Sequence, residues 1–199
     1  MTAVKPSRGD AGRARVIQAA IEAIAESGPD RVTMRQIAAI AGMSPGHVTY
    51  YFSSRDRILI ESLRWSEQEL AESRVQTLAR VRTPWARIVR YVDLYLPSDS
   101  DDLRWNLWNQ IQANPPTDPD STQLLATILK GWETDLEATI RNGISAGAFE
   151  ASVDPRQLSN VTRILLDGVA GEITLNLAGR TPTWGRKLVT NQLRSQLTP

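Results

Sequence analysis

The sequence of 199 residues contains no cysteine and a single histidine, His47. Without cysteine there can be no disulfide, no cysteine-ligated zinc, no iron–sulfur cluster and no thiol nucleophile. One histidine is too few for a histidine-rich zinc site or for the paired ligands of a di-iron helical bundle. Only His47 could serve a Ser-His-Asp triad. We therefore expect no metal, no cofactor and no enzymatic activity.

Long hydrophobic runs are also missing. No apolar stretch approaches the ~18 residues that a membrane span requires, and the N-terminal segment MTAVKPSRGDAGRAR lacks the apolar part of a secretory signal. Hydrophobic residues make up 41% and charged residues 23% of the chain, as in soluble globular proteins. We expect a cytoplasmic protein without a membrane partner.

The net charge of +1 is distributed unevenly along the chain. Residues 1–60 carry eight Lys and Arg and five Asp and Glu, whereas residues 61–199 carry 15 and 17. A basic N-terminal part suits an anionic partner, although an ordinary solvated surface explains so small a difference equally well.

The chain has helical periodicity throughout and no strand-like alternation of useful length. Residues 13–26 carry one apolar stripe, and Thr33 opens a capping box ahead of a second short helix that Gly42 ends. Further helices are predicted over about 55–81, 84–96, 102–113, 121–146, 155–178 and 182–197. Four of the helix starts, that at Ser44 included, pair a capping residue with proline at the first helical position: Ser44-Pro45, Thr83-Pro84, Asp154-Pro155 and Thr181-Pro182.

Residues 33–57 read as two short helices joined by a tight turn, the arrangement of a helix-turn-helix. Apolar residues on the first helix and Val48 on the second can lock the pair together. The side chains left outward are rich in hydrogen-bond donors and carry little negative charge, which suits phosphates and base edges.

The run Ile37-Ala38-x-x-Ala41-Gly42-Met43-Ser44-x-Gly46-x-Val48-x-x-Tyr51-Phe52-x-Ser54-Arg55-Asp56 resembles the DNA-binding domain of the TetR family of bacterial transcriptional repressors. The resemblance covers residues ~13–62 closely. It implies an all-α protein with an N-terminal arm and three-helix DNA-binding domain at 1–57 and a helical effector-binding and dimerisation domain at 58–199. It also implies that these residues contact DNA: Thr33, Arg35, Ser44, Pro45, Gly46, His47, Thr49, Tyr50, Tyr51 and Arg55.

The roles implied by the resemblance differ between these positions. Thr33 would present a helix N-terminus to a phosphate. Pro45, Gly46, His47 and Thr49 would face the major groove. Tyr50 and Tyr51 would hold phosphates through their hydroxyls, and Arg55 would clamp another phosphate. Phe52, by contrast, is expected in the core.

The chain departs from the family at Val48-Thr49, where a Leu-Tyr pair is common. The tyrosine that often contacts bases is thus a threonine, so the preferred bases cannot be inferred.

Tryptophan is concentrated in the middle of the chain, where the resemblance implies a small-molecule pocket. Tryptophan faces suit an apolar or cationic ligand, although filling the core of the bundle is the more ordinary use for most of them. The candidate pocket residues are Trp65, Trp85, Trp105, Trp108, Asn109, Gln112 and Trp132.

The last two helices carry apolar stripes with glycines that allow close packing. The resemblance implies a two-fold interface between two subunits, with a monomeric core as the alternative. The candidate interface residues are Leu158, Val161, Leu165, Gly168, Val169, Leu188, Val189 and Leu193.

Together these features predict a homodimeric repressor that binds a palindromic double-stranded DNA operator and is released by a small-molecule effector. One alternative is an all-helical small-molecule-binding protein or enzyme with a vestigial helix-turn-helix. Another is a DNA-binding protein that takes no ligand.

Overall fold

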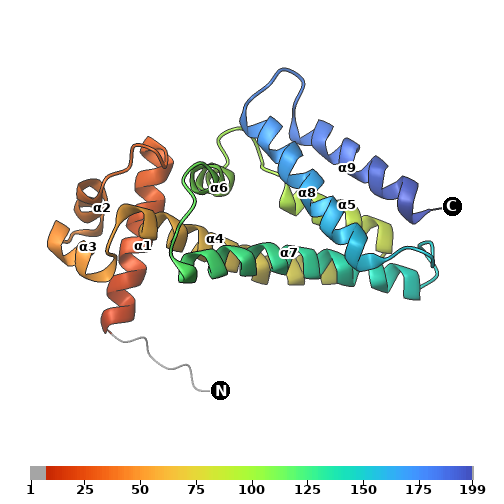
Figure 1. Ribbon diagram of the computed structural model, residues 1–199, viewed down its shortest axis with the longest axis horizontal. Helices are drawn as coiled ribbons and strands as arrows, with labels where there is room; N and C mark the ends of the chain where they lie inside the picture. Colours follow the sequence, from red (N-terminus) through yellow and green to blue (C-terminus); the bar gives the residue numbers. More distant parts are fainter. Residues whose placement is uncertain (1–7, 199) are drawn as a thin grey trace. The chain divides into compact units, whose positions relative to one another are not determined.

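The computed structural model describes residues 8–198, and these form nine α-helices with no strand, which confirms the all-α prediction (Figure 1). None of these helices combines the length and the apolar character needed to cross a membrane. The helices are α1 (Arg8–Ser27), α2 (Met34–Ala41), α3 (Pro45–Tyr51), α4 (Arg55–Arg80), α5 (Pro84–Tyr95), α6 (Leu103–Ala113), α7 (Pro119–Ser145), α8 (Pro155–Thr174) and α9 (Pro182–Leu197).

All four predicted cap–proline pairs start helices, which confirms them. Ser44, Thr83, Asp154 and Thr181 each stand in an extended conformation and accept a hydrogen bond from a backbone N–H of the first helical turn. The proline follows at a position where its missing N–H costs nothing. The starts of α3, α5, α8 and α9 are therefore determined by the local sequence.

Helix α2 is capped at both ends. Thr33 forms the predicted capping box with Gln36, each side chain satisfying a backbone N–H of the other residue. Gly42 takes the left-handed conformation, with φ 63°, and ends α2. A residue with a Cβ is strained at such a φ, so glycine is the residue that this turn requires.

One predicted end is wrong. The apolar pattern predicts a helix to about residue 178, but α8 stops at Thr174. Asn176 adopts a left-handed φ of 52°, which breaks the helix, and Leu175 is exposed. The segment 175–181 is a loop.

The chain forms two compact units: residues 8–67 with 106–122, and residues 68–105 with 123–198. The domain boundary that we predicted at residue 57 falls in the first turn of α4. Residues 106–122 join the first unit, and no signal in the sequence indicated this. The unit boundary runs through α4, α6 and α7, each of which is one continuous helix.

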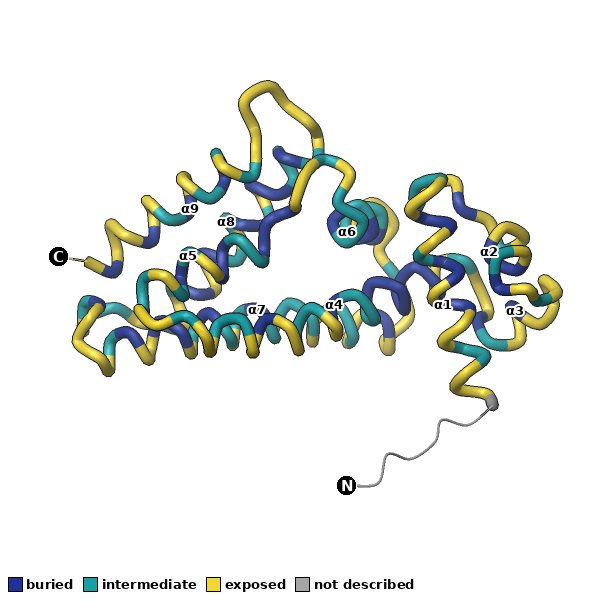
Figure 2. Tube along the Cα trace, turned by 180° about the vertical axis from the view of Figure 1, so that it is seen from behind, coloured by how far each residue is buried: buried dark blue, intermediate teal, exposed yellow. Residues whose placement is uncertain are grey.

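In the first unit, α1 packs against α2 and α3, and each of these helices has buried residues, coloured dark blue in Figure 2. Phe52 is buried, as expected. The residues expected to lock the helix-turn-helix together are also all buried: Ile37, Ala38, Ala41 and Val48.

In the second unit, α9 lies against both α5 and α8. Gly185 on α9 allows this close approach, because a Cβ there would lie 2.6 Å from Val169 Cγ1 and 3.1 Å from Ile173 Cδ1. Val169, Val189 and Leu193 are each at most 3% exposed. They fill the core of their own chain rather than an exposed surface, and their place in a dimer interface stays a prediction.

Candidate functional site

The α2–turn–α3 segment presents a polar surface. Of the ten residues predicted to contact DNA, eight are exposed: Thr33, Arg35, Ser44, Pro45, Gly46, His47, Thr49 and Tyr50. Tyr50 is 81% exposed, an unusual position for a large aromatic side chain unless it serves a partner. The residues of α3 other than Val48 and Tyr51 are exposed.

Three aromatic rings of α3 form a cluster. His47 stacks on Tyr51 at 5.2 Å between ring centroids, and Tyr50 meets Tyr51 edge-on at 5.4 Å. The hydroxyl of Tyr51 lies against α1 at Gly12, where it leaves no room for a Cβ. Tyr51 therefore helps to seat α3 on α1 and supports His47 and Tyr50.

Arg55 serves the fold of the first unit directly. Its Nε donates to the carbonyl of Val32 at 2.8 Å, and its Nη2 donates to the carbonyl of Pro29. These bonds fasten the α1–α2 loop to the start of α4. Contact of Arg55 with a DNA phosphate stays a prediction. Two of the three guanidinium nitrogens, Nε and Nη2, already donate to backbone carbonyls.

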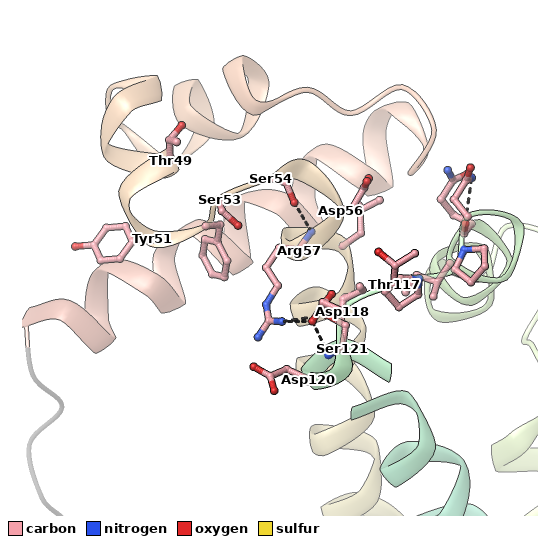
Figure 3. Close-up of a pocket in the computed structure, with 18 of the residues that line it drawn as sticks. Thr49, Tyr51, Ser53, Ser54, Asp56, Arg57, Thr117, Asp118, Asp120 and Ser121 are labelled. Atoms are coloured by element: carbon pink, nitrogen blue, oxygen red, sulfur yellow. Dashed lines mark hydrogen bonds and ion pairs between the residues drawn. The ribbon is translucent and has the colours of Figure 1, made fainter. Parts of the chain in front are cut away.

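A cleft of about 820 Å³ lies in the first unit, between the α3–α4 turn and the α6–α7 connection (Figure 3). Arg57 reaches across it from α4. Its Nη1 donates to Ser121 Oγ at 3.0 Å and lies 3.5 Å from Asp118 Oδ1, and its Nη2 donates to Glu61 Oε1 at 3.1 Å. Nothing in the local sequence pairs residue 57 with residues 118 and 121, so we missed this feature.

Glu61 is the centre of this charge cluster. Its side chain is only 4% exposed and also pairs with Arg13 of α1 at 3.0 Å and Arg64 of α4 at 2.8 Å. Burial alone would raise the pKa of Glu61. The hydrogen bond from Arg64 and the charges of Arg64, Arg13 and Arg57 outweigh it and leave the pKa lowered. Glu61 is therefore a buried carboxylate shared by three arginines.

The second unit contains a buried aromatic cluster of Tyr91, Tyr95, Trp105 and Trp132. Tyr95 lies 4.7 Å from Trp132 and 5.8 Å from Trp105 between ring centroids, and Tyr91 lies 5.6 Å from Trp132. The guanidinium of Arg74 sits 3.8 Å from the Trp132 ring centroid and pairs with Asp135 at 2.6 Å. The face of Trp132 thus already binds one cation.

A carboxylate borders this cluster. Tyr95 Oη donates to Asp167 Oδ1 at 2.5 Å, and Arg163 bridges Asp167 and Glu133. Burial raises the pKa of Asp167, and the bonds from Tyr95 and Arg163 only partly offset this. Burial also raises the pKa of Tyr95, and the charge of Asp167 adds to it. Asp167 is thus a half-buried carboxylate that is already paired with Arg163.

The predicted pocket residues are divided between the two units. Trp105 and Trp132 come together in the buried cluster. Trp85 is half-buried under the guanidinium of Arg194, 4.4 Å from its ring. The other predicted pocket residues belong to the first unit: Trp65, Trp108, Asn109 and Gln112. Gln112 is exposed. The buried Nε1 of Trp108 has no hydrogen-bond partner among the described residues.

The five other predicted interface residues lie at least partly on the surface and form an apolar patch. Val161 is 55% and Leu188 42% exposed, while Leu158 and Leu165 are half-buried and Gly168 is exposed. Ile164, which the sequence analysis did not select, is 56% exposed on α8. We call this set of residues on α8 and α9 the apolar face.

An exposed recognition surface on a capped helix–turn–helix defines a helix-turn-helix protein of the DNA-binding class. Residues 16–61 match the family described as bacterial regulatory proteins, tetR family, and residues 84–198 match the BetI-type transcriptional repressor C-terminal family. The second match covers more than half of the chain. The chain belongs to the TetR family of bacterial regulatory proteins.

Individual relatives agree with this assignment. An HTH-type transcriptional regulator BetI of Brucella anthropi is 34% identical over 40% of this chain and 41% of its own length. The fatty acid metabolism regulator protein of Bacillus subtilis is 23% identical over 71% of this chain and 73% of its own. The match thus spans about two-fifths of the BetI regulator's length.

A solved structure is similar over nearly the whole chain. It is a transcriptional regulator from Saccharomonospora viridis in complex with choline, with a TM-score of 0.83 and 25% identity over 95% of this chain and 98% of that one.

Proposed function

We propose that this protein is a transcriptional repressor that binds a palindromic operator as a homodimer and is released by a small-molecule effector. The observation that carries the proposal is the surface of α2 and α3, where eight of ten predicted contact residues are exposed on a tightly capped scaffold. Exposed hydroxyls, amide N–H groups and Arg35 suit a phosphate backbone and base edges.

The homodimer is supported by the apolar face on α8 and α9. Five large apolar side chains of the second unit's last two helices and their loop are more than 40% exposed: Val161, Ile164, Leu175, Leu177 and Leu188. Surfaces of this kind mark protein–protein contacts. A two-fold dimer would place two recognition helices on two half-sites and double the contacts of one short helix-turn-helix.

For the effector, we propose a small organic cation such as choline. The choline complex of the Saccharomonospora viridis regulator supports this. In this chain, buried tyrosine and tryptophan faces lie beside Asp167, and the face of Trp132 already holds a guanidinium. Aromatic faces with a nearby carboxylate are what recognise a quaternary ammonium group.

The repressor proposal is tested by fluorescence anisotropy on DNA flanking the protein's own gene, with random DNA as the control. We expect preference for the flanking DNA, and a lower affinity for the variants H47A and R35A. If genome-wide selection also recovers no preferred fragment, the proposal is wrong and the vestigial helix-turn-helix alternative is favoured.

The effector proposal is tested separately by thermal unfolding with choline and with 3,3-dimethylbutanol, its uncharged isostere. We expect choline to raise Tm and release DNA, the isostere to do neither, and D167N to weaken the response to choline. Equal shifts from both compounds would exclude recognition of the cation. A broad metabolite panel without any shift would favour a DNA-binding protein that takes no ligand.

A further inference from the structure

The charge cluster around Glu61 connects segments that are far apart in the sequence. Arg13 belongs to α1, Arg57 and Arg64 to the first turns of α4, and Ser121 to the first turn of α7. Glu61 and Ser121 are both buried, at 3% and 0% exposure. Ion pairs and hydrogen bonds at such positions are screened little by solvent and fix their partners in place.

Arg57 has a distinct place in this cluster. Arg64 binds Glu61 alone among the described contacts, whereas Arg57 binds Glu61 with one nitrogen and Ser121 with the other. Figure 3 shows the guanidinium of Arg57 pointing from α4 to Asp118 and Ser121. The backbone N–H of Arg57 also donates to Ser54 Oγ, which caps the start of α4.

The start of α7 is itself held rigidly. Asp118 accepts a hydrogen bond from the backbone N–H of Ser121 at 2.9 Å, and this bond is the first cause of the lowered pKa of Asp118. From here α7 runs as one helix to Ser145, deep into the second unit. A displacement of α7 along or about its axis therefore moves Asp118 and Ser121, the two partners of Arg57.

We propose that Arg57 is a positioning residue that transmits the position of α7 to the DNA-binding helices, by way of Glu61 and Arg13. The inference rests on the proposed function, because the link would serve the response of operator binding to an effector. The bonds themselves lie within the first unit. Removing Arg57, or its partners Asp118 and Ser121 at the start of α7, breaks this link between α7 and the Glu61 cluster.

The test measures the position of α1 relative to α7 within one chain. Because the protein has no cysteine, spin labels can be placed at E26C on α1 and A138C on α7 without other changes. Both residues are exposed. Labelled chains diluted with unlabelled protein report the intramolecular distance by pulsed electron resonance, whether or not the protein is a dimer. Sedimentation reports the dimer independently.

Three variants separate the proposal from a merely structural role. R57Q and the double variant D118N/S121A each break the link to α7, and Asn keeps the helix cap. R64Q is the matched control, because it removes one arginine from the same carboxylate and leaves the link intact. We expect R57Q and D118N/S121A to broaden or shift the distance distribution, and R64Q to keep that of the native protein.

Operator binding supplies a second readout. If the DNA-competent arrangement falls to about a tenth of the population, affinity falls roughly tenfold. Its dependence on salt stays the same, because no phosphate contact is lost. Equal broadening in all three variants would overturn the proposal, as would no broadening in R57Q. A salt slope lowered by about 2 in R57Q, one contact for each subunit of the dimer, would instead make Arg57 a phosphate contact.

Discussion

The role of Arg55 can be decided by a comparison of stability with DNA affinity. Its guanidinium donates to the carbonyl oxygens of Val32 and Pro29, and its side chain is 27% exposed. A hydrogen bond that involves a charged group contributes about 1.5–3 kcal/mol. Because the site is partly exposed, we take the lower value for each of the two bonds. R55A should therefore lose about 3 kcal/mol of unfolding free energy.

For a chain of this length, 1 kcal/mol corresponds to roughly 2–4 °C in Tm. We expect R55A to lower the Tm of the first unit by roughly 6–12 °C in thermal unfolding followed by circular dichroism. Y50A and R35A are the matched controls. Both residues are exposed, so these variants should keep the free energy of unfolding within about 0.5 kcal/mol of the native value and lose DNA affinity.

The reasoning has a clear point of failure. If R55A unfolds at the native temperature and loses affinity for all DNA sequences alike, Arg55 is a phosphate clamp as the resemblance implies. If instead R55A loses stability and recovers native affinity at a temperature where it is fully folded, the guanidinium serves the α1–α2 loop.

Three further results are expected. In chemical denaturation, G185A should lower the free energy of unfolding by about 1–3 kcal/mol, because its Cβ would lie 2.6 Å from Val169 Cγ1. The control G131A on α7 should be neutral or stabilising, because its Cβ would meet nothing within 4 Å. V161D should convert the dimer to monomer in analytical ultracentrifugation, and a dimer that survives would place the interface elsewhere. Glu61 has a lowered pKa in the folded state, so its stabilisation is present above the ordinary pKa near 4.5 and is lost as pH falls through the folded value; acid unfolding of E61Q should lack this component.

The parts of the fold that the sequence predicted correctly are those set by neighbouring residues. The starts of α3, α5, α8 and α9 depend on a capping side chain and a proline next to it, so local reading sufficed. The end of α8 was missed, because Asn176 in a left-handed conformation has no fixed signature in the surrounding apolar pattern.

The parts that were missed depend on contacts distant in sequence. Arg57 and Ser121 are 64 residues apart, and Arg55 bonds backbone carbonyls, which every residue offers. Periodicity also identified the apolar stripes of α8 and α9 without telling which stripe faces the chain's own core. Val169, Val189 and Leu193 face inward, while Val161 and Leu188 face outward.

The use of arginine in the first unit bears on how DNA would be recognised. Arg13, Arg57 and Arg64 surround Glu61, and Arg55 bonds the α1–α2 loop. The excess positive charge of residues 1–60 therefore overstates the charge available to phosphates.

The exposed arginines in the described part of the helix-turn-helix region are Arg15, Arg31 and Arg35, and Arg31 already lies 3.8 Å from Asp30. Three phosphate contacts per subunit give about six per dimer, and hence a slope of about −5 for log affinity against log salt. Affinity would then fall roughly 10³-fold between 50 and 200 mM salt, the low end for a protein of this kind. Since few cations are available, we predict that the N-termini of α2 and α3 and the hydroxyl of Tyr50 supply further phosphate contacts. A much steeper slope, measured by anisotropy titrations across that range, would show that some arginines leave their partners when DNA binds.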